Sequence, residues 1–376
     1  MEKQLNCYFD HSATTPLDLA ISEWIKRTQG EIYGNPSSSH AVGRKAKNIL
    51  ELARKQMAEV LGCHSKEIIF TGSGTESNNS VLHSLLFQEK KHVVTSAIEH
   101  PAILSTLQHL EPLGLSYSIA GVDSRGKVNL SEIEKLIQTD TGLITIMTAN
   151  NEVGTIQPIS ECSDLAKAHN IPFHSDAVQA LGKISIQILL EQVDLMSFSA
   201  HKFYGPKGVG CLYKKENTNL HSFVYGGGQE SNLRGGTENI IGIGAMALAA
   251  QLAVEQIKET TDHIKVLEYQ FITGIKTIRD DIVFHGNSKS HIPGLISFAA
   301  PGMDNQKLLT LLDRENIFVS SGSACHSGLS TPSKILEAMD ISESLNLSTI
   351  RVSFGKHNTD KEVQYFLSVL KKIWMG

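Results

Sequence analysis

The chain has 376 residues, of which 41% are hydrophobic and 19% charged, and its formal net charge at pH 7 is -5. This composition is ordinary for a globular protein long enough for two domains, and it excludes the basic stripe that direct nucleic-acid binding requires. The longest apolar run, 240–250, is shorter than the roughly 20 residues of a membrane-spanning helix, and the first residues lack the apolar core of a signal peptide. We therefore expect a cytoplasmic protein without membrane contact.

From about residue 65, short β-branched runs alternate with helical stretches, which is typical of βαβ units and a mostly parallel sheet. The predicted strands of this region lie at 67–71, 92–96, 142–148, 171–176, 194–199 and 209–213. The predicted helices lie at 75–88, 101–113, 131–137 and 159–169. We expect the third of these helices to begin with a capping box formed by Ser131 and Glu134.

The pattern changes after a long predicted helix at 238–259. Beyond it, the predicted strands lie at 282–285, 295–300, 317–320 and 349–354, and the predicted helices lie at 305–314 and from Thr359 onward. We therefore predict a large α/β domain over 16–259, and a smaller α+β domain made of 1–15 and 260–376.

Two polar residues follow predicted strands at the edge where open α/β sheets bind ligands. Lys202 lies between the strand at 194–199 and the Gly/Pro-rich stretch 205–210, and burial there would lower the pKa of its amine and make it a nucleophile toward an aldehyde. Asp176 ends the strand at 171–176, and a carboxylate at that place suits the pyridine nitrogen of pyridoxal phosphate. An aspartate at a strand end is more often a helix cap, so the argument rests on the two residues together.

Three further motifs lie between a strand and a helix or turn. Gly74 and Thr75, in the small-residue stretch 71–79, could bind a single phosphate at a helix amino terminus, or could form a plain capping turn. His100 could stack on a planar ring and move protons, or be a surface loop histidine. The amide of Asn151 could bind a ring hydroxyl or a carboxylate, although asparagine is also common in turns.

Taken together, these motifs resemble those of cysteine desulfurases of the NifS/IscS type, within the class V aminotransferase group of fold-type I pyridoxal-phosphate enzymes. The resemblance runs over nearly the whole chain and rests on residues 9–16, 34–40, 74–78, 99–100, 150–154, 176–179, 199–202, 234–239 and 320–325. It implies pyridoxal 5'-phosphate as cofactor, and a large domain with a mostly parallel sheet flanked by helices plus a smaller α+β domain.

The resemblance also implies roles for individual residues. Lys202 would carry the cofactor, Asp176 would face its pyridine nitrogen, and His100 would stack on its ring and assist catalysis. The cofactor-binding residues would be Gly74, Thr75, His100, Asn151, Asp176, Gln179, Ser199, His201, Lys202 and Thr237. Thr237 would come from the partner subunit of a homodimer. The substrate-binding residues would be Arg351, Asn151 and Asn35, with Arg351 as a carboxylate clamp, although a strand arginine is otherwise expected in a surface ion pair.

Cys325 is the residue that would select the reaction. It ends the small-residue run 320–325 within a loop that extends to about 332, where a thiol is expected to be exposed and available as a thiolate. The resemblance implies that this thiolate attacks the sulfur of L-cysteine, which leaves L-alanine and a persulfide on Cys325. The neighbouring His326 could lower the thiol pKa or assist transfer, or be a chance surface histidine. The five cysteines show no Cys-x-x-Cys pair and no compact ligand set occurs, so we expect neither disulfides nor a metal site.

Other functions remain open at this point. A selenocysteine lyase or another class V enzyme is the nearest alternative, and a catalytically silent sulfur carrier or regulatory partner is the non-enzymatic one. The persulfide sulfur would pass to an acceptor protein for iron-sulfur cluster assembly or thiolation. The chain stops at Gly376 without the carboxyl-terminal extension by which family members dock an iron-sulfur scaffold, which leaves the acceptor open.

Overall fold

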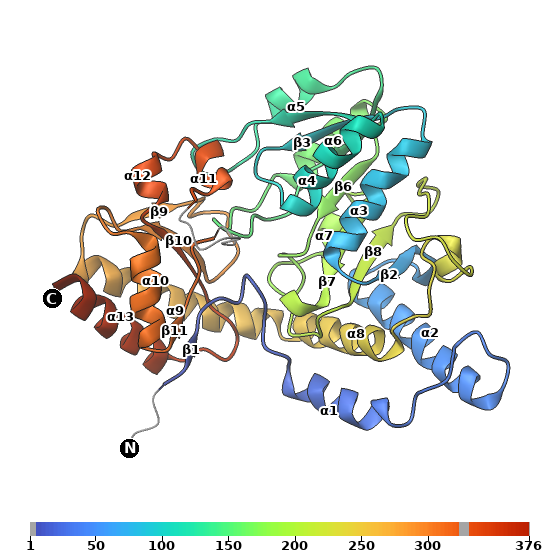
Figure 1. Ribbon diagram of the computed structural model, residues 1–376, viewed down its shortest axis with the longest axis horizontal. Helices are drawn as coiled ribbons and strands as arrows, with labels where there is room; N and C mark the ends of the chain where they lie inside the picture. The colour runs from blue at the N-terminus through green and yellow to red at the C-terminus, as the bar shows by residue number, and fades with distance from the viewer. Residues whose placement is uncertain (1–4, 323–330, 376) are drawn as a thin grey trace.

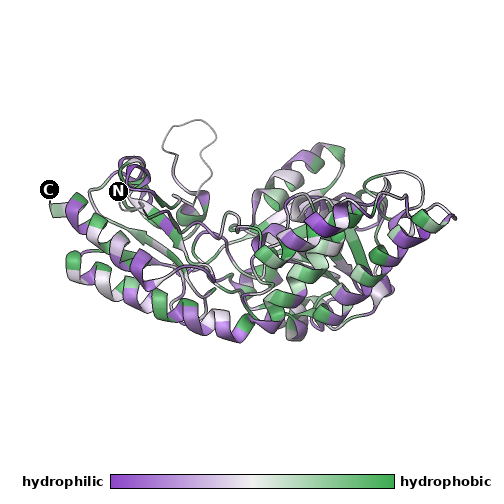
Figure 2. Ribbon diagram, turned by 90° about the horizontal axis from the view of Figure 1, so that it is seen from below, coloured by the Kyte–Doolittle hydropathy of each residue, from purple (hydrophilic) through white to green (hydrophobic). Residues whose placement is uncertain are grey.

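The computed structural model describes residues 5–322 and 331–375. Its elements form a larger and a smaller body (Figure 1). Figure 2 shows the two bodies side by side, with both termini in the smaller one. The first strand therefore belongs to the same body as the last helix, although the whole of the larger body lies between them in the chain.

A seven-stranded sheet forms the centre of the larger body, in the order β2-β8-β7-β6-β5-β3-β4. All neighbouring strands run parallel except β8, which is antiparallel to both β2 and β7. The prediction of a mostly parallel sheet is thus confirmed. The strands are β2 (Ile68–Thr71), β3 (His92–Ser96), β4 (Ser116–Ala120), β5 (Thr141–Thr145), β6 (Phe173–Asp176), β7 (Leu195–Ser199) and β8 (Gly210–Lys214).

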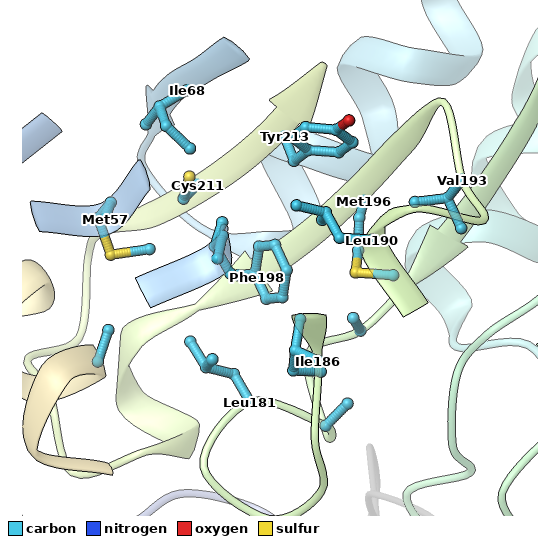
Figure 3. Close-up of a cluster of buried hydrophobic side chains, with 14 of the residues drawn as sticks. Met57, Ile68, Leu181, Ile186, Leu190, Val193, Met196, Phe198, Cys211 and Tyr213 are labelled. Atoms are coloured by element: carbon cyan, nitrogen blue, oxygen red, sulfur yellow. The ribbon is translucent and has the colours of Figure 1, made fainter. Parts of the chain in front are cut away.

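Helices cover both faces of this sheet because successive side chains of a strand point to opposite faces. In β7, Met196 and Phe198 join the core shared with α2 and α8 (Figure 3), whereas Leu195 joins the core shared with α3 and α4. The α-helices of this body are α1 (Leu19–Gln29), α2 (Ala41–Leu61), α3 (Gly74–Ser84), α4 (Pro101–Leu110), α5 (Leu130–Leu136), α6 (Ile159–Ala168), α7 (Gln187–Leu190) and α8 (Ile240–Glu255). Short 3-10 turns are η1 (Ser65–Glu67), η2 (Leu85–Phe87), η3 (Glu111–Leu113), η4 (Ala200–Lys202) and η5 (Glu230–Asn232).

The smaller body has an aromatic core around an antiparallel sheet in the order β12-β10-β9. Its strands are β9 (Val283–His285), β10 (Leu295–Ala299) and β12 (Thr349–Ser353), and β1 (Cys7–Tyr8) pairs in parallel with β11 (Ile317–Phe318). Its helices are α9 (Ile257–Ile278), α10 (Asn305–Arg314), α11 (Lys334–Ala338), α12 (Glu343–Asn346) and α13 (Asp360–Met375). Phe9 from the amino-terminal segment packs on Phe354 and Phe366, and so holds that segment in this core.

Two helix predictions were wrong in detail. The capping box does not form, because α5 begins one residue earlier, with Asn129 as its N-cap accepting from the N–H groups of Ser131 and Glu132. The helix predicted at 238–259 is two helices, α8 and α9, which are bent by 67° at Gln256. In the part of the chain that the structure describes, no single helix is long and apolar enough to cross a membrane, although this bent pair passes that test when its two helices are taken together.

Candidate active site

A cavity of about 380 Å³ lies where the carboxyl ends of β6 and β7 meet the amino terminus of α3 and the start of the chain. This volume falls within the range of small-molecule sites. The predicted site residues that line it are Gly74, Thr75, His100, Asn151, Asp176, Gln179, Ser199, His201, Lys202 and Arg351. The crossover connections of the sheet therefore bring together residues that are distant in sequence.

Lys202 ends the 3-10 turn η4 directly after β7, as its place after an apolar strand predicted. Its Nζ donates to the carbonyl oxygens of Ser12 at 2.7 Å and Ala13 at 2.8 Å. Burial, and then the positive charge of Arg351, lower the pKa of Lys202 to about 8, although the Asp176 carboxylate acts in the opposite direction. A lysine with this pKa has a substantial fraction of nucleophilic free amine near neutral pH.

Asp176 is the last residue of β6, and its carboxylate is buried. Oδ2 accepts from Asn78 Nδ2 at 2.6 Å, and Oδ1 accepts from the N–H of Val178 at 2.9 Å. Asn78 lies on α3 and was not predicted as a site residue, since nothing in its local sequence shows that α3 passes beside β6. These two donors hold the carboxylate in place at the wall of the cavity.

The amino terminus of α3 borders the cavity with Ser73, Gly74 and Thr75. Ser73 is the N-cap, and its Oγ accepts from the N–H of Glu76 at 3.1 Å. Helix geometry leaves the N–H groups of Gly74 and Thr75 without partners inside the helix, and the helix dipole favours an anion there. A Cβ on Gly74 would lie 2.5 Å from Val178 Cγ2, so only glycine allows this close approach to the turn after β6.

His100 is the N-cap of α4, and its Nδ1 accepts from the N–H of Ala102 at 3.1 Å. Desolvation lowers the pKa of His100; the negative charge of Asp176 opposes this shift and the positive charge of Lys202 adds to it. The ring is therefore neutral near pH 7, and its proton is on Nε2 because Nδ1 already accepts a hydrogen bond. His201 is also neutral near pH 7, since burial and then the charge of Lys202 lower its pKa to about 4.

Arg351, in the middle of β12, is buried at the boundary between the two bodies. Its Nη2 donates to Asp10 Oδ1 at 2.6 Å, and its Nη1 donates to the carbonyl of Asn151 at 2.9 Å. Two polar atoms at this end of the cavity, Arg351 Nε and Asn151 Oδ1, are buried and have no hydrogen-bond partner among residues 5–322 and 331–375. Buried polar groups are normally hydrogen-bonded, so this end of the cavity suits a polar ligand.

Glu152 is a buried residue next to the cavity to which the sequence assigned no role. Its Oε2 accepts from Ser333 Oγ at 2.6 Å, and a Cβ on Gly322 would lie 2.9 Å from the same oxygen. Burial raises its pKa. Glu152 thus bonds Ser333 and lies against Gly322, the two residues that flank the segment containing Cys325. The sequence signal that could have identified Glu152 is its place in the motif at 150–154.

Three predicted site residues are not among the residues that line the cavity. Asn35 and Thr237 are exposed, Asn35 before α2 and Thr237 before α8. The Thr237 loop nevertheless reaches α3, because Arg234 Nε donates to Glu76 Oε1 at 2.9 Å. Cys325 lies outside the described residues, as does His326.

The chain is similar to known proteins over nearly its whole length. Residues 7–366 match the family described as Aminotransferase class-V. The chain is 41% identical over 369 residues to a protein of Dictyoglomus turgidum named cysteine desulfurase IscS, covering 97% of this chain and 94% of that protein. A solved NifS-like protein is 37% identical with a TM-score of 0.93, covering 99% of this chain and all of that one. A structure titled SspA in complex with cysteine is 34% identical with a TM-score of 0.81, covering 94% of this chain and all of that one.

Proposed function

The chain belongs to the class-V aminotransferase family, and from that premise we propose that it is a pyridoxal-phosphate-dependent cysteine desulfurase. The observation that carries the proposal is a single cavity that joins the Lys202 amine, the Asp176 carboxylate and the amino terminus of α3. The reaction removes the sulfur of L-cysteine and leaves L-alanine. The relatives named above support the choice of cysteine over other amino acids.

The residues of the cavity fit each polar part of pyridoxal phosphate. Lys202 suits the aldehyde, and Asp176 suits the pyridine nitrogen. The phosphate would be held by the free N–H groups at the start of α3, with the Thr75 hydroxyl, Ser199 and His201 beside them. When bound, the cofactor draws electrons from the Cα of an amino acid and so makes its Cα proton acidic.

The protein's own groups would then bind the substrate and move its protons. Lys202 Nζ, with its lowered pKa, can take up and return a proton near neutral pH. Neutral His100 presents a donor at Nε2 to the cavity. Arg351 would orient the substrate carboxylate, with its buried Nε as a donor that has no partner in the described part of the chain.

We propose Cys325 as the sulfur acceptor partly because the other cysteines are unsuited to the role. They are buried or half-buried free thiols, and burial raises the pKa of each, to about 12 in Cys7, Cys63 and Cys162. A thiolate is the reactive form, and these thiols form it poorly. In the balanced reaction, one sulfur atom moves from L-cysteine to the Cys325 thiol, which yields L-alanine and a Cys325 persulfide. An acceptor protein would then take the outer sulfur.

A homodimer that supplies Thr237 across its interface is part of the proposal. Thr237 and Asn35 are both exposed, and each lies near an exposed tyrosine of the same connecting segment. Tyr33 exposes 79% of its surface and Tyr225 exposes 74%. Exposed aromatic side chains of this kind are enriched where subunits meet. In the homodimer that we propose, Thr237 would lie beside the cavity of the partner subunit.

Alanine production tests the proposed function directly. The purified protein, supplied with pyridoxal phosphate and a thiol reductant, is expected to release alanine and sulfide from L-cysteine. The same assay with L-selenocysteine separates a desulfurase from a selenocysteine lyase, for which selenocysteine would be the only productive substrate. A protein that binds neither cofactor nor substrate would instead be a silent sulfur carrier, contrary to the proposal.

The lowered pKa of Lys202 predicts how cofactor attachment depends on pH. Only the free amine attacks an aldehyde, so the rate at which cofactor-free protein takes up pyridoxal phosphate should rise with pH and level off above about 8. At pH 7.5, roughly a quarter of the amine would be free, against roughly 0.1% for an ordinary lysine. Stopped-flow absorbance between pH 6 and 10 measures this rate. A rate that still rises steeply between pH 9 and 10 would show an unperturbed lysine instead.

A further inference from the structure

Lys183 is a buried lysine for which the function proposed above has no role. It lies in the turn after β6, and its Nζ donates to Gln179 Oε1 at 2.6 Å. Burial, and then the positive charges of Lys202 and Arg351, lower its pKa to about 7. Among the described residues, the structure gives this amine no carboxylate partner. Burying a lysine without an acidic partner is unfavourable, so its presence calls for an explanation.

The local fold places Lys183 one helical turn after Gln179. The N–H of Ala180 donates to the Ala177 carbonyl at 2.9 Å, and the N–H of Lys183 donates to the Ala180 carbonyl at 3.0 Å. Gly182 has a φ of +75° and packs so closely on α8 that a Cβ would lie 2.7 Å from Ala253 Cβ. The turn is therefore pressed against α8, and Lys183 borders a cavity of about 40 Å³ between the two bodies, behind Lys202.

Two hydrogen bonds, one to Lys183 and one to Ser12, hold the orientation of the Gln179 amide. In its protonated form the Lys183 amine can only donate, and this form requires the oxygen of Gln179 to face Lys183. Its Nε2 then faces the other way, where it donates to the carbonyl of Ser12 at 2.8 Å. That carbonyl also accepts from Lys202 Nζ. Both neighbours of the amide thus require the same orientation, and the four residues form one chain of hydrogen bonds from Lys183 to Lys202.

We propose that Lys183 is a positioning residue that fixes the Gln179 amide so that its N–H donors face the Lys202 side of the site, where the ring oxygen of the cofactor would bind. The inference rests on the proposed function, because it needs a cofactor in this cavity. Without the Lys183 amine, the Gln179 amide loses one of the two contacts that hold this orientation, so a turned-over amide becomes more populated. Its oxygen would then face the Ser12 carbonyl and the ring oxygen. Both are hydrogen-bond acceptors, so neither could bond with the amide oxygen.

The Lys183→Met variant separates positioning from structural support. Methionine is an unbranched apolar side chain that fills irregular space, so the buried positive charge is removed without a large cavity. We expect the variant to bind pyridoxal phosphate about tenfold more weakly than wild type, since a donor is lost and an acceptor is exposed in its place. The melting temperature of the cofactor-free protein should stay the same or rise. The visible absorption maximum of the bound cofactor should also shift.

A double-mutant cycle tests whether the effect passes through Gln179. The cofactor dissociation constant is measured for wild type, Lys183→Met, Gln179→Met and the double variant. In the Gln179→Met background, adding Lys183→Met should change this constant by less than about twofold, because no amide remains to be oriented. Lys167→Met is the matched control, since Lys167 also donates to a glutamine Oε1, that of Gln192, but on the surface.

Two kinds of result overturn the inference. One is a dissociation constant and absorption maximum that are unchanged in Lys183→Met. The other is an equal loss of affinity in both backgrounds together with a lower melting temperature, which would show that Lys183 supports the structure alone. Failure of the wild-type protein to bind pyridoxal phosphate would overturn the proposed function itself, and is thereby distinguished from failure of the inference.

Discussion

Replacing Lys202 with alanine is expected to lower the rate of alanine formation from L-cysteine by about 10⁴-fold. The amine would be lost both as the attachment point of the cofactor and as the group that moves the Cα proton. Its hydrogen bonds to the Ser12 and Ala13 carbonyls show that the amine reaches across the cavity to the start of the chain. The measurement is alanine release under saturating cofactor, together with the visible absorption of the purified variant.

Lys215→Ala is a suitable control for this variant. Lys215 follows β8 at the surface, where it forms a loose ion pair of 3.9 Å with Asp194. We expect wild-type turnover from it, because exposed ion pairs of this kind contribute little. Adding a small primary amine to Lys202→Ala should restore part of the lost rate. Turnover within tenfold of wild type in Lys202→Ala would contradict the assignment of this lysine.

Replacing Cys325 with alanine should lower alanine formation by about 10³-fold or more while leaving the absorption of the bound cofactor unchanged. The reason is chemical, since the cavity residues that we propose for cofactor binding include no thiol to receive the substrate sulfur. The variant therefore separates cofactor binding from sulfur transfer. Stopped-flow absorbance after addition of L-cysteine, followed by alanine quantification, measures both.

Cys63→Ala provides the matched control for the cysteine variant. Cys63 is half-buried, and burial and then the charge of Glu67 raise its pKa to about 12, so it is a poor nucleophile. The control should keep wild-type alanine formation. If Cys325→Ala released alanine at the wild-type rate, or if Cys63→Ala were the inactive variant, the sulfur acceptor would have to be sought elsewhere.

Lys202 and Asp176 could be placed from the sequence because each follows an apolar strand, and the carboxyl ends of parallel strands meet at one edge of a sheet. Their partners could not be placed in this way. Ser12 is 190 residues from Lys202, and Asn78 is 98 residues from Asp176. Contacts at such separations depend on which elements pack together, and a local pattern carries no signal of that choice.

The helix errors also have physical causes. Asn129 is one of the strongest N-cap residues and lies two residues before Ser131. It therefore caps the helix in place of Ser131. The break at Gln256 reflects two different environments. Helix α8 is apolar on most of its surface and lies in the core of the larger body, whereas α9 presents one apolar face to the core of the smaller body.

The central claim is that this protein moves the sulfur of L-cysteine onto Cys325. A single-turnover experiment without reductant or acceptor tests it most directly. Alanine is quantified, and the masses of the protein's peptides are measured by mass spectrometry. The account predicts one alanine per subunit and a Cys325 peptide heavier by one sulfur atom, with the other cysteine peptides unchanged. Alanine released without added sulfur on Cys325, or cofactor-loaded protein that forms no alanine, would contradict it.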